Sequence, residues 1–184
     1  MSTSTILWRR LDVTGHDACR LIEAPGGWSL EGTASYRQDE MLACLVYKVA
    51  CDRDWRTQEG FIHGWIDERS IDFRLARSSD DVWTLNGQVV PQLKGCLDLD
   101  LGFTPATNLF QIRRIALGVG EAADVRVAWF DERAVTVDTL CQRYERRSED
   151  TYWYTSPRFG YSGLLRVNAL GFVEKYPDLW EAES

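Results

Sequence analysis

Five polar side chains that could do chemistry lie close together in the middle of the chain, within the otherwise apolar segment 95–115. They are two carboxylates, an amide and two guanidinium groups: Asp98, Asp100, Asn108, Arg113 and Arg114. Residues 96–101 have the alternating pattern of a β-strand, which places both aspartates on one face and the leucines at 97, 99 and 101 on the other. Arginine binds carboxylates and phosphates through paired hydrogen bonds, so the segment also supplies candidate anion ligands.

The two aspartates leave three interpretations open. Carboxylates at i and i+2 on a strand lie roughly 6–7 Å apart at Cα, which is compatible with the acid and base of glycoside hydrolysis, and Glu31 is a further carboxylate that could take part. If Asp98 and Asp100 face solvent, no function follows. If they face the interior, they need partners, because an unpaired buried charge is very costly. The adjacent Arg113 and Arg114 are the nearest candidates, and on a strand only one of them can point toward the aspartates.

Aromatic side chains form a second candidate cluster between residues 144 and 161. Tyr152 and Tyr154 share one face of a predicted strand, and Trp153 lies on the other. Rings exposed on a concave face would stack on sugars or line an acyl channel. Packed inward, the same rings are ordinary core residues.

The composition excludes several classes of function. The net charge of −7 argues against nucleic acid and anionic membrane surfaces as partners. The five cysteines lack CxxC spacing, so we expect no zinc site but free thiols in a reducing cytoplasm. The chain shows no signal peptide and no apolar run near the ~18 residues of a transmembrane segment. Phosphate-binding loops, dinucleotide fingerprints and nucleophile elbows are missing, so we expect no cofactor.

Strand-like segments bounded by Gly, Pro, Asn and Asp recur along the whole chain and predict an all-β sandwich, roll or barrel. Segment 135–145 fits either a helix or a strand, and its Val and Thr content favours a strand. Asn86-Gly87 predicts a hairpin turn. The one helix start is Thr104-Pro105, which predicts a short helix near 104–111 followed by a strand over 112–119. No linker interrupts this pattern, so we expect a single domain over residues 1–184.

Three consecutive motifs in the central segment resemble the signature of a glycolipid-binding family that was long known as a domain of unknown function. They are Cys96–Leu101, Thr104–Asn108 and Ile112–Ile115. Shorter motifs agree in order along nearly the whole chain, among them Gly27–Gly32, Tyr152–Tyr154 and Gly171–Val173. The chain departs from the family pattern at Gln111, where we expect proline, which leaves 109–111 free to stay helical. It departs again at Gln58, where we expect arginine, which weakens the argument for an essential cation at this position.

The resemblance implies a spiral β-roll of about fifteen mostly antiparallel strands wrapped around one short central helix. It also implies a homodimer and a likeness in shape to bacterial lipoprotein carriers. The implied function is non-enzymatic binding of a long-chain glycolipid, by analogy of shape. In this hypothesis an acyl chain lies in an apolar lumen and polar residues hold the head group. The candidate residues are Asp98, Asp100, Asn108, Arg113, Arg114, Tyr152 and Tyr154.

Two other hypotheses compete with binding. An enzyme acting on carbohydrate or lipid would need Asp98 and Asp100 to converge on an open cleft, with at least one raised pKa. A purely structural role would make the polar residues of 98–114 an internal network that anchors the helix, and such a network must be fully hydrogen-bonded to be tolerated. The binding and structural hypotheses can both hold.

Overall fold

The computed structural model describes residues 2–183 and contains one sheet of fifteen strands, which is not closed into a barrel. The order across the sheet is β8-β7-β6-β5-β4-β3-β2-β1-β15-β14-β13-β12-β11-β10-β9. The strands are β1 (Thr3–Arg10), β2 (Thr14–Ala24), β3 (Gly27–Gln38), β4 (Met41–Asp52), β5 (Thr57–Ile66), β6 (Arg69–Arg77), β7 (Trp83–Leu85), β8 (Gln88–Val89), β9 (Asp98–Leu101), β10 (Ala122–Asp131), β11 (Thr136–Arg146), β12 (Thr151–Ser156), β13 (Tyr161–Val167), β14 (Val173–Tyr176) and β15 (Trp180–Ala182).

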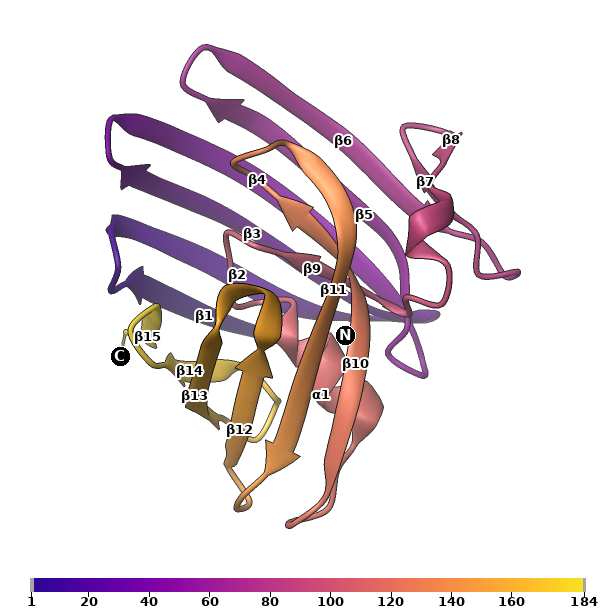
Figure 1. Cartoon of the computed structure of the whole chain (residues 1–184), viewed down its shortest axis with the longest axis vertical. Helices are drawn as coiled ribbons and strands as arrows, with labels where there is room; N and C mark the ends of the chain where they lie inside the picture. The colour runs from indigo at the N-terminus through magenta and orange to yellow at the C-terminus, as the bar shows by residue number, and fades with distance from the viewer. Residues whose placement is uncertain (1, 184) are drawn as a thin grey trace.

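The first and last strands of the chain meet in the middle of the sheet, where β1 pairs antiparallel with β15. On one side of this junction, β1 to β6 form consecutive antiparallel hairpins, and on the other side β15 to β10 do the same (Figure 1). Among the strands of residues 2–183, only β9 runs parallel to its neighbour, β10. The far edge of the sheet curls back toward β5, where the Thr57 amide donates to the Leu97 carbonyl (2.9 Å) and the Leu99 amide donates to Thr57 Oγ1 (3.0 Å). The expected spiral all-β roll is therefore confirmed.

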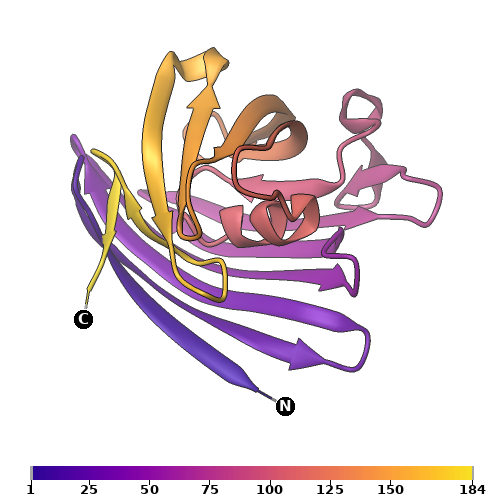
Figure 2. The same ribbon diagram turned by 90° about the horizontal axis from the view of Figure 1, so that it is seen from below.

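One α-helix, α1 (Asn108–Ile115), lies against the inner face of the sheet and is enclosed by its second half (Figure 2). Phe103 and Phe110 are fully buried between the two halves. Trp8 ties the halves together, because its indole N–H donates to the Val173 carbonyl at 2.6 Å. Gly60 on β5 leaves room for the side chain of Leu99, since a Cβ there would meet Leu99 Cδ2 at 2.3 Å. Among residues 2–183, no helix or strand covers the opposite face of β1 to β5 (Figure 2).

The helix begins and ends four residues later than predicted, and the strand predicted over 112–119 is wrong. Thr104-Pro105 forms a turn in which Thr104 Oγ1 accepts from the Ala106 amide (3.0 Å), and the helix starts only at Asn108. Residues 112–115 make its second turn, which ends at Ala116 in the left-handed conformation (φ 45°). The missing proline at Gln111 permits this continuation, and the i, i+3 spacing of Ile112 and Ile115 suits a helix as well as a strand.

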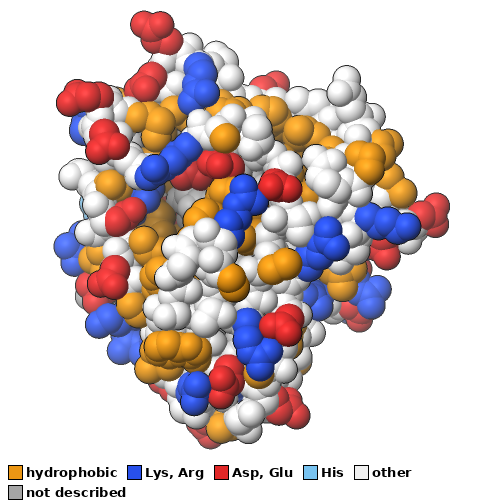
Figure 3. All heavy atoms as spheres, in the orientation of Figure 1, with side chains coloured by type: hydrophobic (Ala, Val, Ile, Leu, Met, Phe, Trp, Pro, Cys, Tyr) orange, Lys and Arg blue, Asp and Glu red, His pale blue; other side chains and the backbone are white. Residues whose placement is uncertain are grey.

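Two finer predictions are confirmed. The ambiguous segment 135–145 forms the strand β11, and Asn86-Gly87 joins β7 to β8 with both residues at positive φ (50° and 80°). Lysine, arginine and acidic side chains are interspersed over the face seen in Figure 3, without a continuous basic surface. Within residues 2–183, no helix is long and apolar enough to cross a membrane.

Candidate functional site

The aspartates of the central segment are both buried, so the solvated interpretation is wrong. All four residues of β9 are buried, with Asp98 0% and Asp100 8% exposed. β9 pairs with β10 along one edge, and it also contacts α1 and β5. With these neighbours its side chains are buried on both faces. Each carboxylate therefore needs its own partners.

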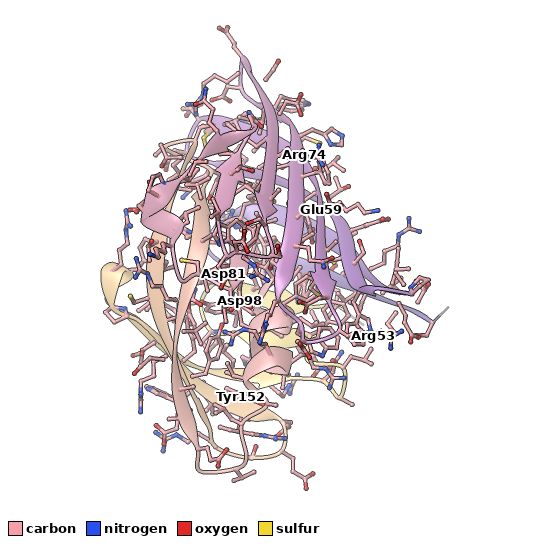
Figure 4. All side chains as sticks on the ribbon, turned by 90° about the vertical axis from the view of Figure 1, so that its right-hand side faces the viewer. Arg53, Glu59, Arg74, Asp81, Asp98 and Tyr152 are labelled. Carbon is pink, nitrogen blue, oxygen red and sulfur yellow. The ribbon has the colours of Figure 1, made fainter. Side chains whose placement is uncertain are left out.

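Asp98 on β9 is paired with Arg114 on α1. The helix follows β9 in the chain and packs against it, which places Arg114 beside Asp98. Arg114 donates from Nε to both carboxylate oxygens (2.9 and 3.1 Å) and from Nη2 to Oδ2 (2.7 Å). Burial raises the pKa of Asp98, and the hydrogen bonds and charge of Arg114 oppose this rise. Both carboxylate oxygens of Asp98 are thus hydrogen-bonded by Arg114. Figure 4 shows Asp98 in the interior, above α1.

Asp100 accepts two hydrogen bonds from neutral groups and has no ion-pair partner among the described residues. Thr107 Oγ1 donates to Oδ1 (3.0 Å), and Gln142 Nε2 on β11 donates to Oδ2 (2.6 Å). Burial raises the pKa of Asp100 from 3.8 to about 6, and these two hydrogen bonds only partly offset it. A buried acidic group with a raised pKa and no charged partner is a candidate for a functional site.

Asn108 joins a second chain of hydrogen bonds at the start of the helix. Its Nδ2 donates to the hydroxyl of Tyr144 (2.7 Å), and that hydroxyl donates to Gln111 Oε1 (2.6 Å). A third buried carboxylate, Asp17 on β2, accepts from Tyr47 (2.9 Å) and from Thr104. Together these bonds fix the turn and the helix against the two halves of the sheet.

A cavity of about 450 Å³ lies at the N-terminal end of α1, and we call it the aromatic cavity. Asp100 and Asn108 line it together with Glu132 at the β10–β11 turn. Six of its lining residues are aromatic, and they come from β10 and from the segment between β12 and β15: Trp129, Tyr154, Phe159, Tyr161, Tyr176 and Trp180. The sheet order brings these rings together, because β15 to β12 lie side by side.

The walls of the aromatic cavity carry polar groups that the protein does not satisfy. Arg10 Nη1, Gln38 Oε1 and Ser156 Oγ are buried without a hydrogen-bond partner among the described residues. Burial also raises the pKa of Glu132, and its Oε2 lies 2.8 Å from the position that a Cβ at Gly102 would take. Buried polar atoms without partners call for a water or a polar ligand.

A second cleft, of about 640 Å³, lies at the C-terminal end of α1, and we call it the arginine cleft. Its lining includes Trp55 from the β4–β5 turn, Arg113 from the helix, and Arg146 and Tyr152 from the hairpin of β11 and β12. Figure 4 shows Tyr152 on the side of α1 opposite to Asp98. Arg113 and Tyr152 thus belong to a different site from Asp100, Asn108 and Tyr154.

The distribution of candidates bears on the enzyme hypothesis. Asp100, Asn108 and Tyr154 line the aromatic cavity, whereas Arg113 and Tyr152 line the arginine cleft. Asp98 and Arg114 line neither, so Asp98 and Asp100 do not converge on one of these sites. Within residues 2–183, no three His, Cys, Asp or Glu side chains are grouped to hold a metal ion.

Sequence reasoning missed the residues that reach the aromatic cavity from distant strands. Arg10 and Gln38 end β1 and β3, and Glu132 directly follows β10, so only the sheet order brings them together. Gln142 and Tyr144 could have been predicted to point inward, because alternation along β11 places both on the same, buried face.

Comparison with known proteins places the chain in a family. Residues 5–182 match the model of the family described as "Putative glycolipid-binding". The chain belongs to this family. A crystal structure of a DUF1089 family protein from Pseudomonas aeruginosa is similar, with a TM-score of 0.79 and 23% sequence identity over 98% of this chain and 92% of that one. At this identity the likeness supports the fold alone. A search of the curated proteins gave no match.

Proposed function

We propose that this protein binds the head group of a glycolipid-like amphiphile in the aromatic cavity, without catalysis. The observation that carries the proposal is the combination of six aromatic rings with buried, partly unsatisfied polar groups around one cavity. Sugars present hydroxyl groups and apolar C–H faces, which match these two kinds of wall. The volume of about 450 Å³ lies within the range of small-molecule sites, roughly 300–1,000 Å³.

The candidate residues take different roles in this proposal. Asp100 and Asn108 hydrogen-bond the sugar, since each oxygen of Asp100 keeps a second lone pair beyond its bond to Thr107 or Gln142. Tyr154 supplies a ring of the wall. The pair of Asp98 and Arg114 holds the helix that presents Asn108.

The acyl chain is the part of the ligand for which the interior offers least room. Phe103 and Phe110 are fully buried, and the helix lies between the two halves of the sheet (Figure 2). We therefore place the first methylene groups against Leu140 and Leu179 in the wall of the aromatic cavity, with the rest of a long chain outside the roll. This replaces the expectation of an acyl chain in the lumen.

Titration calorimetry with octyl β-glucoside, below its critical micelle concentration and at pH 8, tests the proposal. We expect the wild-type protein to bind it, and Asp100→Asn to bind it about tenfold or more weakly, because a hydrogen bond to a charged group contributes roughly 1.5–3 kcal/mol. Glucose and octanoate should each bind more weakly than the complete amphiphile.

Asp124→Asn is the matched control, because Asp124 is an exposed carboxylate at the start of β10 and lines neither site. Absence of binding to the wild-type protein, or equal binding to Asp100→Asn, would contradict the proposal. Turnover of a 4-nitrophenyl glycoside would instead favour an enzyme.

We also propose that the protein is a homodimer joined through the outer face of β1 to β5. That face contains a groove of about 1080 Å³ whose walls include Leu7, Val46 and Phe61, and Leu7 is 41% exposed. Exposed apolar surface of this kind marks association in soluble proteins, and the family resemblance implies a second copy as the partner.

Sedimentation velocity tests the dimer. Leu7→Glu is expected to shift the wild-type dimer to a monomer, because it introduces a charge into the proposed interface. Leu164→Glu, on β13, is the control, since Leu164 is 44% exposed but lies outside the groove. A monomeric wild-type protein at micromolar concentration would refute this arrangement.

We further propose a cytoplasmic location. Five free cysteines, of which Cys19, Cys51 and Cys96 are buried, are consistent with a reducing compartment. Recovery of the native protein from a non-cytoplasmic fraction would contradict this location.

A further inference from the structure

The guanidinium group of Arg113 in the arginine cleft has no hydrogen-bond acceptor or ion-pair partner among the described residues. Its neighbour Arg114 is bound to Asp98, and Arg146 across the cleft donates to the carbonyls of Leu117, Ser148 and Glu149. Arg113 is therefore the one arginine of this group whose planar set of donors is left for a ligand.

Arg113 is held in place by apolar contacts instead of hydrogen bonds. Its Cζ lies 5.1 Å from the ring centroid of Trp55, which is a cation–π contact. Its aliphatic part packs on Gly171, where a Cβ would come within 3.2 Å of Arg113 Cδ, and Gly171 has a φ of +98° that favours glycine. Arg113 is an exposed residue, and these contacts orient its side chain while its N–H groups stay accessible to a ligand.

The tryptophan under Arg113 is itself held in a rare conformation. Trp55 has a φ of 64°, which is uncommon for a bulky residue and marks a constrained position. The turn is fixed by Asp52, whose Oδ1 accepts from the amides of Asp54 and Arg56 (2.9 Å each). Trp28 stacks on the Trp55 ring with a centroid distance of 3.8 Å and an interplanar angle of 10°. The Trp55 ring that Arg113 contacts is thus held in position by the protein itself, without a ligand.

The opposite wall adds a second cation and a hydroxyl donor. Arg146, fixed by its three carbonyls, places its Cζ 5.7 Å from the ring centroid of Tyr152. The Tyr152 hydroxyl has no hydrogen-bond partner among the described residues. Burial raises the pKa of Tyr152, and the charges of Arg146 and Arg113 oppose the rise.

The acidic residues of the cleft lie on one side of it. Glu149 and Asp150 are exposed members of the turn between β11 and β12, and Asp150 Oδ1 accepts from Ser148 (2.7 Å). The formal charge of the lining is therefore balanced, so a ligand would be held by directed hydrogen bonds to Arg113 and not by a broad positive field.

We propose that the arginine cleft is a second binding site that takes the carboxylate or phosphate group of a small ligand through Arg113 and Tyr152. The proposal does not rest on the sugar site in the aromatic cavity, because the two sites lie at opposite ends of α1 and share no lining residue. The same anionic chemistry could come from a free sugar derivative or from a lipid head group.

Calorimetry with glucuronic acid, glycerol 1-phosphate, dihexanoylphosphatidylglycerol and glycerol tests this site. We expect at least one anionic probe to bind and glycerol not to bind. Arg113→Gln should weaken that binding about tenfold or more, and Arg113→Lys should weaken it less, since lysine keeps the charge but loses the bidentate geometry. Tighter binding of the phosphatidylglycerol than of glycerol 1-phosphate would identify a lipid head group, and the reverse a free anion.

Arg143→Gln on β11 is the control, because Arg143 is exposed, pairs with Asp124 and lies outside the cleft. Asp100→Asn should leave anion binding unchanged, which separates this site from the sugar site. The inference is overturned if no anionic probe binds at millimolar concentration, or if Arg113→Gln binds as tightly as the wild-type protein.

Discussion

Replacing Asp98 with alanine is expected to destabilise the protein by about 3 kcal/mol, the lower end of the effect of breaking a buried ion pair. Asp98 is fully buried, and its three hydrogen bonds with Arg114 span 2.7–3.1 Å. The variant leaves a guanidinium in the interior with no partner. The lower end applies because the Arg114 side chain is 18% exposed and can reach some water. Urea unfolding at pH 7 measures the change.

A double variant separates the pair's net contribution from the effect of leaving one charge alone. Asp98→Leu with Arg114→Met should be more stable than Asp98→Ala, because apolar residues of similar size often replace a buried pair at little net loss. Asp124→Ala is the control, since the Asp124–Arg143 pair is exposed and worth about 1 kcal/mol or less. Equal midpoints for Asp98→Ala and this control would show that the central pair does not hold the helix.

The Asp98–Arg114 pair also shows what sequence reasoning could reach. Alternation predicted that both aspartates share a face, and proximity suggested one arginine of the adjacent pair as a partner. The choice between the two arginines depended on the helix period. On a strand Arg113 and Arg114 point in opposite directions, whereas on α1 they are about 100° apart and only Arg114 turns back to β9.

The two cavities were beyond the reach of a single sequence for a different reason. Strand positions follow from local alternation, but the pairing of β1 with β15 joins residues at least 170 positions apart and leaves no local trace. Gln38 and Glu132 meet in the aromatic cavity only through that order. Trp55 and Arg146 meet across the arginine cleft in the same way.

Asp100→Asn is expected to make the protein more stable at pH 7 and no more stable at pH 4. Burial raises the pKa of Asp100 from 3.8 to about 6, so between these values the folded state binds the proton more tightly than the unfolded state. The free energy of unfolding of the wild-type protein therefore falls as the pH rises through this window, by up to about 3 kcal/mol for two pKa units. The asparagine has no such ionisation.

The neighbours of residue 100 can form hydrogen bonds with the asparagine side chain of Asp100→Asn. Thr107 Oγ1 can still donate to the asparagine oxygen, and Gln142 Oε1 is buried without a partner among the described residues. If the Gln142 amide rotates, its oxygen accepts from the new Nδ2 group, and one atom of the Gln142 amide is left without a partner, as in the wild-type protein. Asp17, whose pKa burial also raises to about 6, contributes equally to both proteins and cancels in the difference.

Urea unfolding at intervals from pH 4 to pH 7 should show the difference between Asp100→Asn and wild type growing with pH, while Asp124→Asn runs parallel to wild type. Parallel curves for Asp100→Asn would mean that Asp100 ionises normally in the folded protein. This experiment also bears on the structural hypothesis. A carboxylate whose neutral replacement stabilises the fold is not there to anchor the helix. Retention of such a residue at the wall of a polar cavity is the pattern expected when stability is given up for binding.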